Sequence, residues 1–163
     1  MTHSQASSGN EAENDSRDRP LSTTIRVEKP VTEVFDFLAD GTHDPCWLSW
    51  VATSELLAYG GGVGASYRQS LRGSALGRRE VRYRLVHLRR PSLLGVEATS
   101  LPGRPLARFR LAPLGPTTTE VALTIEVSGT SGSQGPAPIG LRWATHMVAS
   151  LPQLKACLES SVS

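Results

Sequence analysis

The sequence predicts an α+β domain in which a curved antiparallel sheet of about seven strands wraps around a long C-terminal helix. Three observations predict it. Six runs between residues 54 and 128 alternate apolar and polar side chains, which is the period of a strand. Two short helical patterns follow a first strand near the N-terminus, and a long helical repeat of apolar residues closes the chain. That last helix is the main available cover for the apolar face of the sheet.

The chain of 163 residues is long enough for one domain with a real core. Residues 1–19 contain no large apolar residue after Met1 and are rich in Ser, Asn, Glu and Asp, so we expect a disordered tail. Residues 20–163 then form the folded domain. The sequence shows no secretory signal pattern and no apolar run of membrane-spanning length, so we expect a cytoplasmic protein without a membrane span.

The first elements follow from local spacing. Residues 21–29 alternate as a strand, and a helix begins at Pro30, because apolar residues recur at helical spacing at Val31, Val34, Phe35 and Leu38. The segment 41–50 indicates a short second helix or turn. There Asp44 can cap the helix and Pro45 can occupy its first position.

The remaining strands are expected at 54–59, 64–72, 78–89, 92–99, 105–112 and 118–128, joined by short turns and therefore paired in sequence. Four glycines lie within residues 60–64, but a strand pattern follows them instead of a helix, and no Lys-Ser or Lys-Thr pair is present. A phosphate-binding loop needs a helix that begins after its glycines and a Lys-Ser or Lys-Thr pair. The glycines therefore predict a hairpin connection with positive φ angles.

The chain ends in a flexible connection over 130–138 and one long helix. The helix presents Ala144, Met147, Leu151, Leu154 and Leu158 on one side. We expect Pro152 to kink it, because proline lacks the N–H that a helix interior needs.

Charge and cysteine usage narrow the function classes. The chain has 17 basic and 15 acidic residues, with a formal net charge of +2. A cluster of arginines lies mostly on polar strand positions, which favours a solvated sheet face over a nucleic-acid site: Arg78, Arg79, Arg82, Arg84, Arg89 and Arg90. Cys46 and Cys157 lie far apart and show no metal-ligand spacing, so neither a disulfide nor a metal is expected, and both are interpreted as buried apolar residues.

The segments "IRVEKPVTEVFDFLADGTHDPCW", "YGGGVGASYR", "VHLRRPSLL", "GPTTTEVALTIEV" and "LPQLKACLE" together resemble the START-like, or SRPBCC, superfamily, and most of all its small bacterial polyketide cyclase/dehydrase proteins. The resemblance implies a helix-grip fold with a deep cavity between sheet and helix. It also implies a hydrophobic or aromatic small-molecule ligand and no cofactor. The family contains enzymes of secondary metabolism and non-catalytic carriers of lipids, isoprenoids or quinones, and both readings stay open, with a monomer or a homodimer expected.

On the strands, candidate site residues are the polar ones that share parity with the apolar side chains, and the other candidates are residues that could pack against an aromatic ligand. Tyr67, Tyr83 and His87 are the candidates for proton donation or acceptance. A bulge near residue 85 or 86 would reverse this assignment and turn Arg82 and Arg84 inward, but the first reading is favoured. The candidates for ligand contact are Trp47, Trp50, Gln69, Phe109, Trp143 and Met147. No nucleophile–base pair, carboxylate pair or metal cluster is recognisable.

Overall fold

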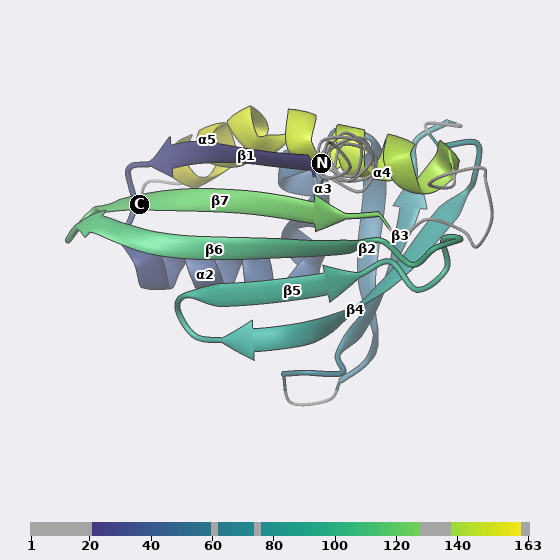
Figure 1. The fold of residues 1–163 in the computed structure, drawn as a ribbon, viewed down its shortest axis with the longest axis horizontal. Coiled ribbons are helices and arrows are strands. Elements are labelled where there is room, and N and C mark those ends of the chain that lie inside the picture. Colours follow the sequence, from purple (N-terminus) through teal and green to yellow (C-terminus); the bar gives the residue numbers. More distant parts are fainter. Residues whose placement is uncertain (1–20, 60–61, 74–75, 128–137, 161–163) are drawn as a thin grey trace, which may run out of the picture.

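The computed structural model describes residues 21–59, 62–73, 76–127 and 138–160, and the expected tail and most of the 130–138 connection lie outside them. Seven antiparallel strands form one sheet in the order β1-β7-β6-β5-β4-β3-β2 (Figure 1). The strands are β1 (Leu21–Val27), β2 (Val51–Ala58), β3 (Ser66–Leu71), β4 (Glu80–Arg89), β5 (Leu93–Glu97), β6 (Leu106–Gly115) and β7 (Thr118–Glu126). The expected pairing of sequential strands is confirmed, and β1 completes the sheet beside β7.

The second strand begins earlier than its sequence pattern predicts. The prediction starts at residue 54, whereas β2 begins at Val51, which is fully buried and pairs with Leu71. In the connection to β3, Gly62 and Gly64 have φ angles of +126° and +98°. Glycine adopts these angles without the steric penalty of a Cβ. The hairpin interpretation is therefore confirmed for these two glycines, while residues 60–61 lie outside the described ranges.

Within the described ranges, five short helical segments accompany the sheet: α2 (Val31–Ala39), the 3-10 turn η1 (Gly41–His43), α3 (Asp44–Trp47), α4 (Pro138–Ala149) and α5 (Leu151–Ser160). The single kinked helix predicted at the C-terminus is instead two consecutive helices that meet at Ser150. Pro152 has no N–H to continue the ladder of α4, and the N–H groups of Gln153 and Leu154 donate to the Ser150 carbonyl at the start of α5. None of the described helices is long and apolar enough to cross a membrane.

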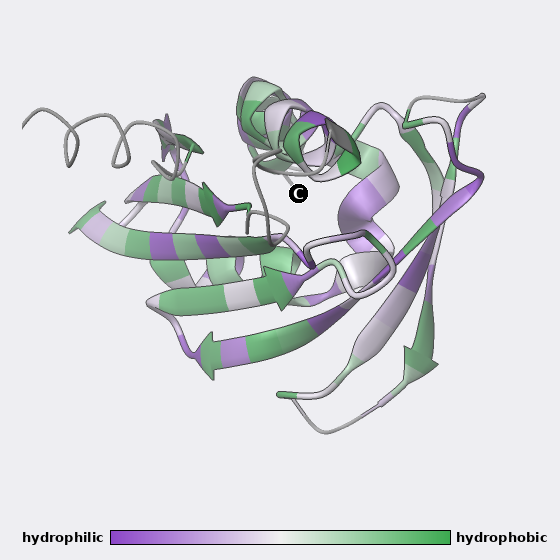
Figure 2. Ribbon diagram, turned by 45° about the vertical axis from the view of Figure 1, so that its right-hand side comes forward, coloured by the Kyte–Doolittle hydropathy of each residue, from purple (hydrophilic) through white to green (hydrophobic). Residues whose placement is uncertain are grey.

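The sheet curves strongly, so that β2 and β3 run across the direction of β6 and β7 (Figure 1). Hydrophilic and hydrophobic residues alternate along the strands, and the sheet bends beneath the C-terminal helices (Figure 2). Its inner face carries fully buried side chains such as Leu123 and Ile125 on β7 and Phe109 on β6. This is the predicted helix-grip architecture: a curved antiparallel sheet closed by helices.

The orientation of β4 decides which polar residues reach the interior. Val81, Tyr83 and Leu85 are buried, whereas Arg82 and Arg84 are exposed and form ion pairs with Glu80 and Glu97. A register shift does occur, but only after Leu85. The reading that places Tyr83 inward is therefore confirmed. The bulge changes only the last part of the strand.

The two cysteines form a disulfide, contrary to the prediction from the sequence. Cys46 on α3 and Cys157 on α5 have Cα atoms 6.3 Å apart and form a disulfide across 111 residues of sequence. The prediction of two unlinked cysteines was wrong because it relied on local spacing, and only the packing of α3 against α5 brings the two side chains together. The disulfide fastens α3 to the C-terminal helices.

Candidate functional site

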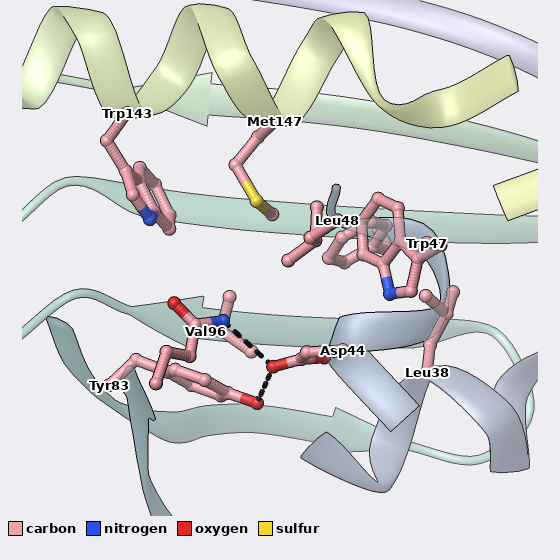
Figure 3. Close-up of a pocket in the computed structure, with 10 residues that line it drawn as sticks. Leu38, Asp44, Trp47, Leu48, Tyr83, Val96, Trp143 and Met147 are labelled. Atoms are coloured by element: carbon pink, nitrogen blue, oxygen red, sulfur yellow. Dashed lines mark hydrogen bonds between the residues drawn. The ribbon is translucent and has the colours of Figure 1, made fainter. Parts of the chain in front are cut away.

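A narrow pocket lies between α4, α3 and the inner face of the sheet. Its ten lining residues are Leu38, Asp44, Trp47, Leu48, Gln69, Tyr83, Val96, Phe109, Trp143 and Met147. Trp143 and Met147 project from α4 toward Asp44 and Tyr83 on the opposite side (Figure 3). The cavity volume is about 20 Å³. This is room for one water-sized group, since a water needs at least roughly 10–15 Å³ on such a measure.

Asp44 is the charged group of this pocket. It is the first residue of α3, and its side chain turns into the core, where the residue is only 7% exposed. Its Oδ2 atom accepts hydrogen bonds from Tyr83 Oη at 2.6 Å and from Gln69 Nε2 at 2.9 Å. The three side chains come from α3, β4 and β3. We call them the Asp44 cluster.

Burial raises the pKa of Asp44 from its ordinary 3.8 to about 6, although the hydrogen bonds from Tyr83 and Gln69 favour the ionised form. The pKa of Tyr83 lies well above its ordinary value, because the phenol is buried and faces the Asp44 carboxyl. Asp44 can therefore gain or lose a proton near neutral pH, whereas Tyr83 keeps its own. This is the pKa range in which a carboxyl works as a general acid or base.

Tyr67 supports the cluster from the neighbouring strand. Its ring stacks on that of Tyr83, with ring centroids 5.3 Å apart, and the two residues are direct partners across β3 and β4. Gly41 of η1 sits against both rings. A Cβ built on Gly41 would collide with Tyr83 Oη and lie 2.7 Å from Tyr67 Cδ2. The absence of a side chain at Gly41 thus lets η1 approach the tyrosines and places Asp44 beside Tyr83.

Two polar atoms of the pocket have no partner within the described part of the chain. Gln69 Oε1 and Trp143 Nε1 are buried without a hydrogen bond, and their residues are 3% and 2% exposed. Buried polar groups are nearly always paired, and each unpaired one costs about 1–3 kcal/mol. An unpaired acceptor and an unpaired donor that line the same cavity are features of a polar binding site.

The structure brings most of the predicted site residues together. Tyr67 lies directly behind Tyr83, with their rings stacked. The pocket is lined by six of the predicted residues: Tyr83, Gln69, Trp47, Phe109, Trp143 and Met147. Trp50 is buried outside it, at the junction of α4 and α5. There its Nε1 donates to Ser150 Oγ at 3.4 Å, and its ring lies 5.7 Å from that of His146. Trp50 is therefore not part of the pocket.

His87 is also absent from the pocket. It follows the register shift in β4, pairs with Gly95, and packs so closely over it that a Cβ on Gly95 would lie 2.7 Å from His87 Cδ2. Gly95 pairs in turn with Arg108, whose neighbour Phe109 points inward. His87 is thus on the outer face of the sheet. The inward facing predicted for His87 is wrong because the register shift between Leu85 and His87 reverses the parity that Tyr83 follows.

Sequence reasoning missed the role of Asp44. It interpreted this residue as a helix cap, but α3 carries no side-chain cap, and the carboxyl faces the core. One signal was present: Gln69 on an apolar strand face requires a buried partner. The identity of that partner could not be read from the sequence, because Asp44 precedes Gln69 by 25 residues and reaches it only through the turn at η1.

The pocket is smaller than the deep cavity that the family resemblance implies. A second hollow of about 320 Å³ is lined by Val63, Gly64, Arg84, Leu85 and Val86, and it contains none of the predicted site residues. Nowhere in the described ranges do three or more His, Cys, Asp or Glu side chains gather in a way that could hold a metal ion. The chemistry that the pocket offers is proton exchange and hydrogen bonding within an apolar enclosure.

Several solved structures share this fold. The Zhui aromatase/cyclase from Streptomyces sp. R1128 is 20% identical over 89% of this chain and 96% of its own, with a TM-score of 0.69. The di-domain aromatase/cyclase BexL of the BE-7585A biosynthetic pathway is 19% identical over 86% of this chain, with a TM-score of 0.68. The chain spans only 46% of BexL. A START superfamily protein from Mycobacterium smegmatis is 18% identical over 88% of this chain and 96% of its own, with a TM-score of 0.61.

At these identities the likeness shows the fold alone. A comparison with the sequences of curated proteins found no match. The family model described as "Polyketide cyclase / dehydrase and lipid transport" matches residues 20–159, which is nearly all of the described fold. The chain therefore belongs to the polyketide cyclase/dehydrase and lipid transport family.

Proposed function

We propose that this protein binds a hydrophobic or aromatic small molecule in the Asp44 pocket and acts on it as a polyketide cyclase/dehydrase-type enzyme of secondary metabolism. The observation that carries the proposal is the Asp44–Tyr83 hydrogen bond of 2.6 Å in a pocket whose other walls are mostly apolar. Burial that raises the pKa of a carboxyl to about 6 costs stability, and perturbed carboxyls of this kind cluster at functional sites, where they move protons.

An aldol closure of a poly-β-ketone fits these groups. The Asp44 carboxylate takes a proton from a carbon between two carbonyls, and the resulting enolate carbon forms a bond to a second carbonyl carbon of the same chain. The oxygen of that second carbonyl receives the proton back from Asp44. Loss of this hydroxyl with a neighbouring hydrogen as water, followed by tautomerisation of the remaining ring ketones to enols, then gives the aromatic ring. The Tyr83 phenol steadies the carboxylate while it is ionised and orients it.

A polyketide-sized ligand requires the pocket to widen. The present cavity holds only a water-sized group, so the body of the ligand must displace a wall. Met147 on α4 is the most adaptable of the apolar walls, because its unbranched side chain changes rotamer readily. We therefore expect ligand entry to move Met147 and neighbouring Trp143, and the tryptophan fluorescence of the protein to change with it.

The test is turnover of a synthetic linear poly-β-keto thioester, with aromatic products separated by liquid chromatography and compared with those formed in buffer alone. Asp44→Asn should lower the protein-dependent rate by about 10²–10⁴-fold, the usual contribution of general acid–base catalysis. His87→Gln is the matched control, since His87 is on the outer face and should leave the rate unchanged. A rate that survives Asp44→Asn would show that the Asp44 cluster is not the catalytic group.

The alternative is a non-catalytic carrier of a lipid, isoprenoid or quinone, and seven of the ten lining residues are apolar, as a carrier needs. The same experiment separates the two functions. If the protein is a carrier, binding of the thioester would quench or shift its tryptophan fluorescence. The products separated by chromatography would then be the same as those formed in buffer alone. The Asp44 cluster favours the enzyme, because a lipid chain offers no polar group that a buried carboxyl could bind.

A further inference from the structure

We propose that Trp143 Nε1 and Gln69 Oε1 form a donor–acceptor pair that selects a ligand hydroxyl group. This inference rests on the proposed function, because it assumes that the Asp44 pocket is the ligand site. It adds the chemical feature that the site recognises. The residues concerned are distinct from Asp44, which would move the proton, and from Tyr83, which would orient it.

The two atoms share an environment that makes their lack of partners informative. Both belong to side chains that are more than nine-tenths buried, and both side chains line the one cavity. Trp143 extends from α4 on one side of the pocket, and Asp44 lies opposite it (Figure 3). Gln69 lies on β3, and its Nε2 donates a hydrogen bond to Asp44. By contrast, the buried Trp50 donates its N–H to Ser150 Oγ. The buried indole of Trp50, outside the pocket, thus has a hydrogen-bond partner, whereas the buried indole of Trp143, inside the pocket, has none among the described residues.

The orientation of the Gln69 amide is fixed by Asp44. Its Nε2 donates to Asp44 Oδ2, so the remaining Oε1 can only accept. Trp143 Nε1 can only donate. A hydroxyl is the smallest group that both donates and accepts, and it fits a cavity of about 20 Å³. An ether or ketone oxygen satisfies Trp143 but leaves Gln69 unpaired, and a hydrocarbon satisfies neither.

The charge of the pocket narrows the choice further. Asp44 is the only ionisable group besides Tyr83 among the lining residues, and both are acids. An ionised ligand carboxylate or phosphate would face an anion or a neutral acid with no cation to balance it, which is costly in a buried site. The group recognised is therefore a neutral hydroxyl, as in a phenol or an enol.

Three naphthalenes of similar size test this: 2-naphthol, 2-methoxynaphthalene and naphthalene, titrated by isothermal calorimetry at neutral pH. Two ratios of affinities are compared between wild type and variants, so that solvation of the ligands cancels. The ratio for 2-naphthol and naphthalene reports the Trp143 donor, and the ratio for 2-naphthol and 2-methoxynaphthalene reports the Gln69 acceptor. Trp143→Phe keeps an aromatic side chain without the donor, and Trp50→Phe is the matched control for loss of a buried indole elsewhere.

We expect Trp143→Phe to weaken binding of 2-naphthol by about tenfold, which corresponds to about 1.4 kcal/mol, while Trp50→Phe has no effect. Gln69→Met should reduce the preference for 2-naphthol over 2-methoxynaphthalene, because it removes the acceptor. If Trp143→Phe does not fold, a sulfur analogue of tryptophan without the N–H replaces it at position 143.

The outcomes separate the two proposals. Equal binding of all three naphthalenes by wild type would overturn the hydroxyl selection while leaving the aromatic ligand site intact. A preference for 2-naphthol that persists in both pocket variants would assign it to other groups, with an ordered water satisfying Trp143 and Gln69, and would overturn the inference too. No binding of any naphthalene would overturn both the inference and the aromatic-ligand proposal on which it rests.

Discussion

Tyr83 donates a hydrogen bond of 2.6 Å to Asp44, a residue 39 positions earlier in the chain, and so joins the short helix α3 to strand β4 of the sheet. The link depends on the close approach of η1 to the stacked rings of Tyr67 and Tyr83 at Gly41. The disulfide from Cys46 to Cys157 also links the same helix to α5. Asp44 is thus held in place by groups from the sheet and from α5.

The raised pKa of Asp44 predicts that this residue makes the protein less stable as pH rises from about 4 to about 6. In that interval the unfolded chain has lost the Asp44 proton while the folded protein still holds it, so rising pH favours unfolding. The penalty reaches about 3 kcal/mol above pH 6, since one pKa unit is about 1.4 kcal/mol. Urea unfolding of wild type and Asp44→Asn across this range measures it.

The free-energy difference between the two proteins should change by this amount between pH 4 and pH 6 and stay constant outside the interval. Other titrating groups, such as the ion-paired Asp36, cancel because both proteins contain them. A difference that is flat from pH 4 to pH 7 would show that Asp44 keeps an ordinary pKa.

Gly41→Ala should destabilise the fold and disturb the Asp44 cluster. Its methyl group would collide with Tyr83 Oη and the Tyr67 ring, and overpacking of this kind costs about 1–3 kcal/mol. Gly115→Ala is the control, because nothing lies within 4 Å of a Cβ built there. Thermal unfolding of both variants measures the effect. Equal melting temperatures would contradict the close packing of η1 on the tyrosines.

Tyr83→Phe should lower stability by about 1–3 kcal/mol and raise the pKa of Asp44 above 6, because the carboxylate loses a donor that favours its ionised form. Tyr67→Phe serves as the comparison. The Tyr67 ring stacks on that of Tyr83, but the phenol that donates a hydrogen bond to Asp44 is that of Tyr83. Denaturant unfolding gives the stabilities. This prediction is wrong if both substitutions shift the pKa of Asp44 equally.

Removing the disulfide should also lower stability. The bridge closes a span of 111 residues, and a loop of about 100 residues is worth up to about 4–5 kcal/mol in the chain-entropy model. Cys157→Ser should lower the melting temperature under oxidising conditions, and wild type in a strong reductant should approach the variant. Mass spectrometry with and without reductant would show whether the bond is present. A wild-type protein that stays reduced in air would contradict the pairing.

The order and facing of the strands could be predicted because they depend on local alternation. Val121, Leu123 and Ile125 on β7 point inward as their period of two requires, and Tyr83 and Gln69 follow from the same rule. The prediction ended where the pattern did. His87 follows a register shift, which reverses the face of each later residue, and its side chain lies outside.

The centre of the site could not be predicted, because it depends on contacts between distant segments. Asp44 has the sequence features of a helix cap, and only the bend at η1 turns it toward Tyr83 and Gln69. The disulfide was missed for the same reason, since 111 residues separate its cysteines. The narrowness of the pocket depends on how Met147 and Trp143 pack from α4, and no spacing rule encodes this.

The most direct test of the central claim is the titration of the Asp44 carboxyl carbon by nuclear magnetic resonance, with and without saturating 2-naphthol. We expect a midpoint near pH 6 in the free protein, and a higher one with ligand, because the ligand excludes water from the pocket. A midpoint near the ordinary value of 3.8 that the ligand does not move would contradict the claim that Asp44 is the proton-exchanging group of a binding pocket.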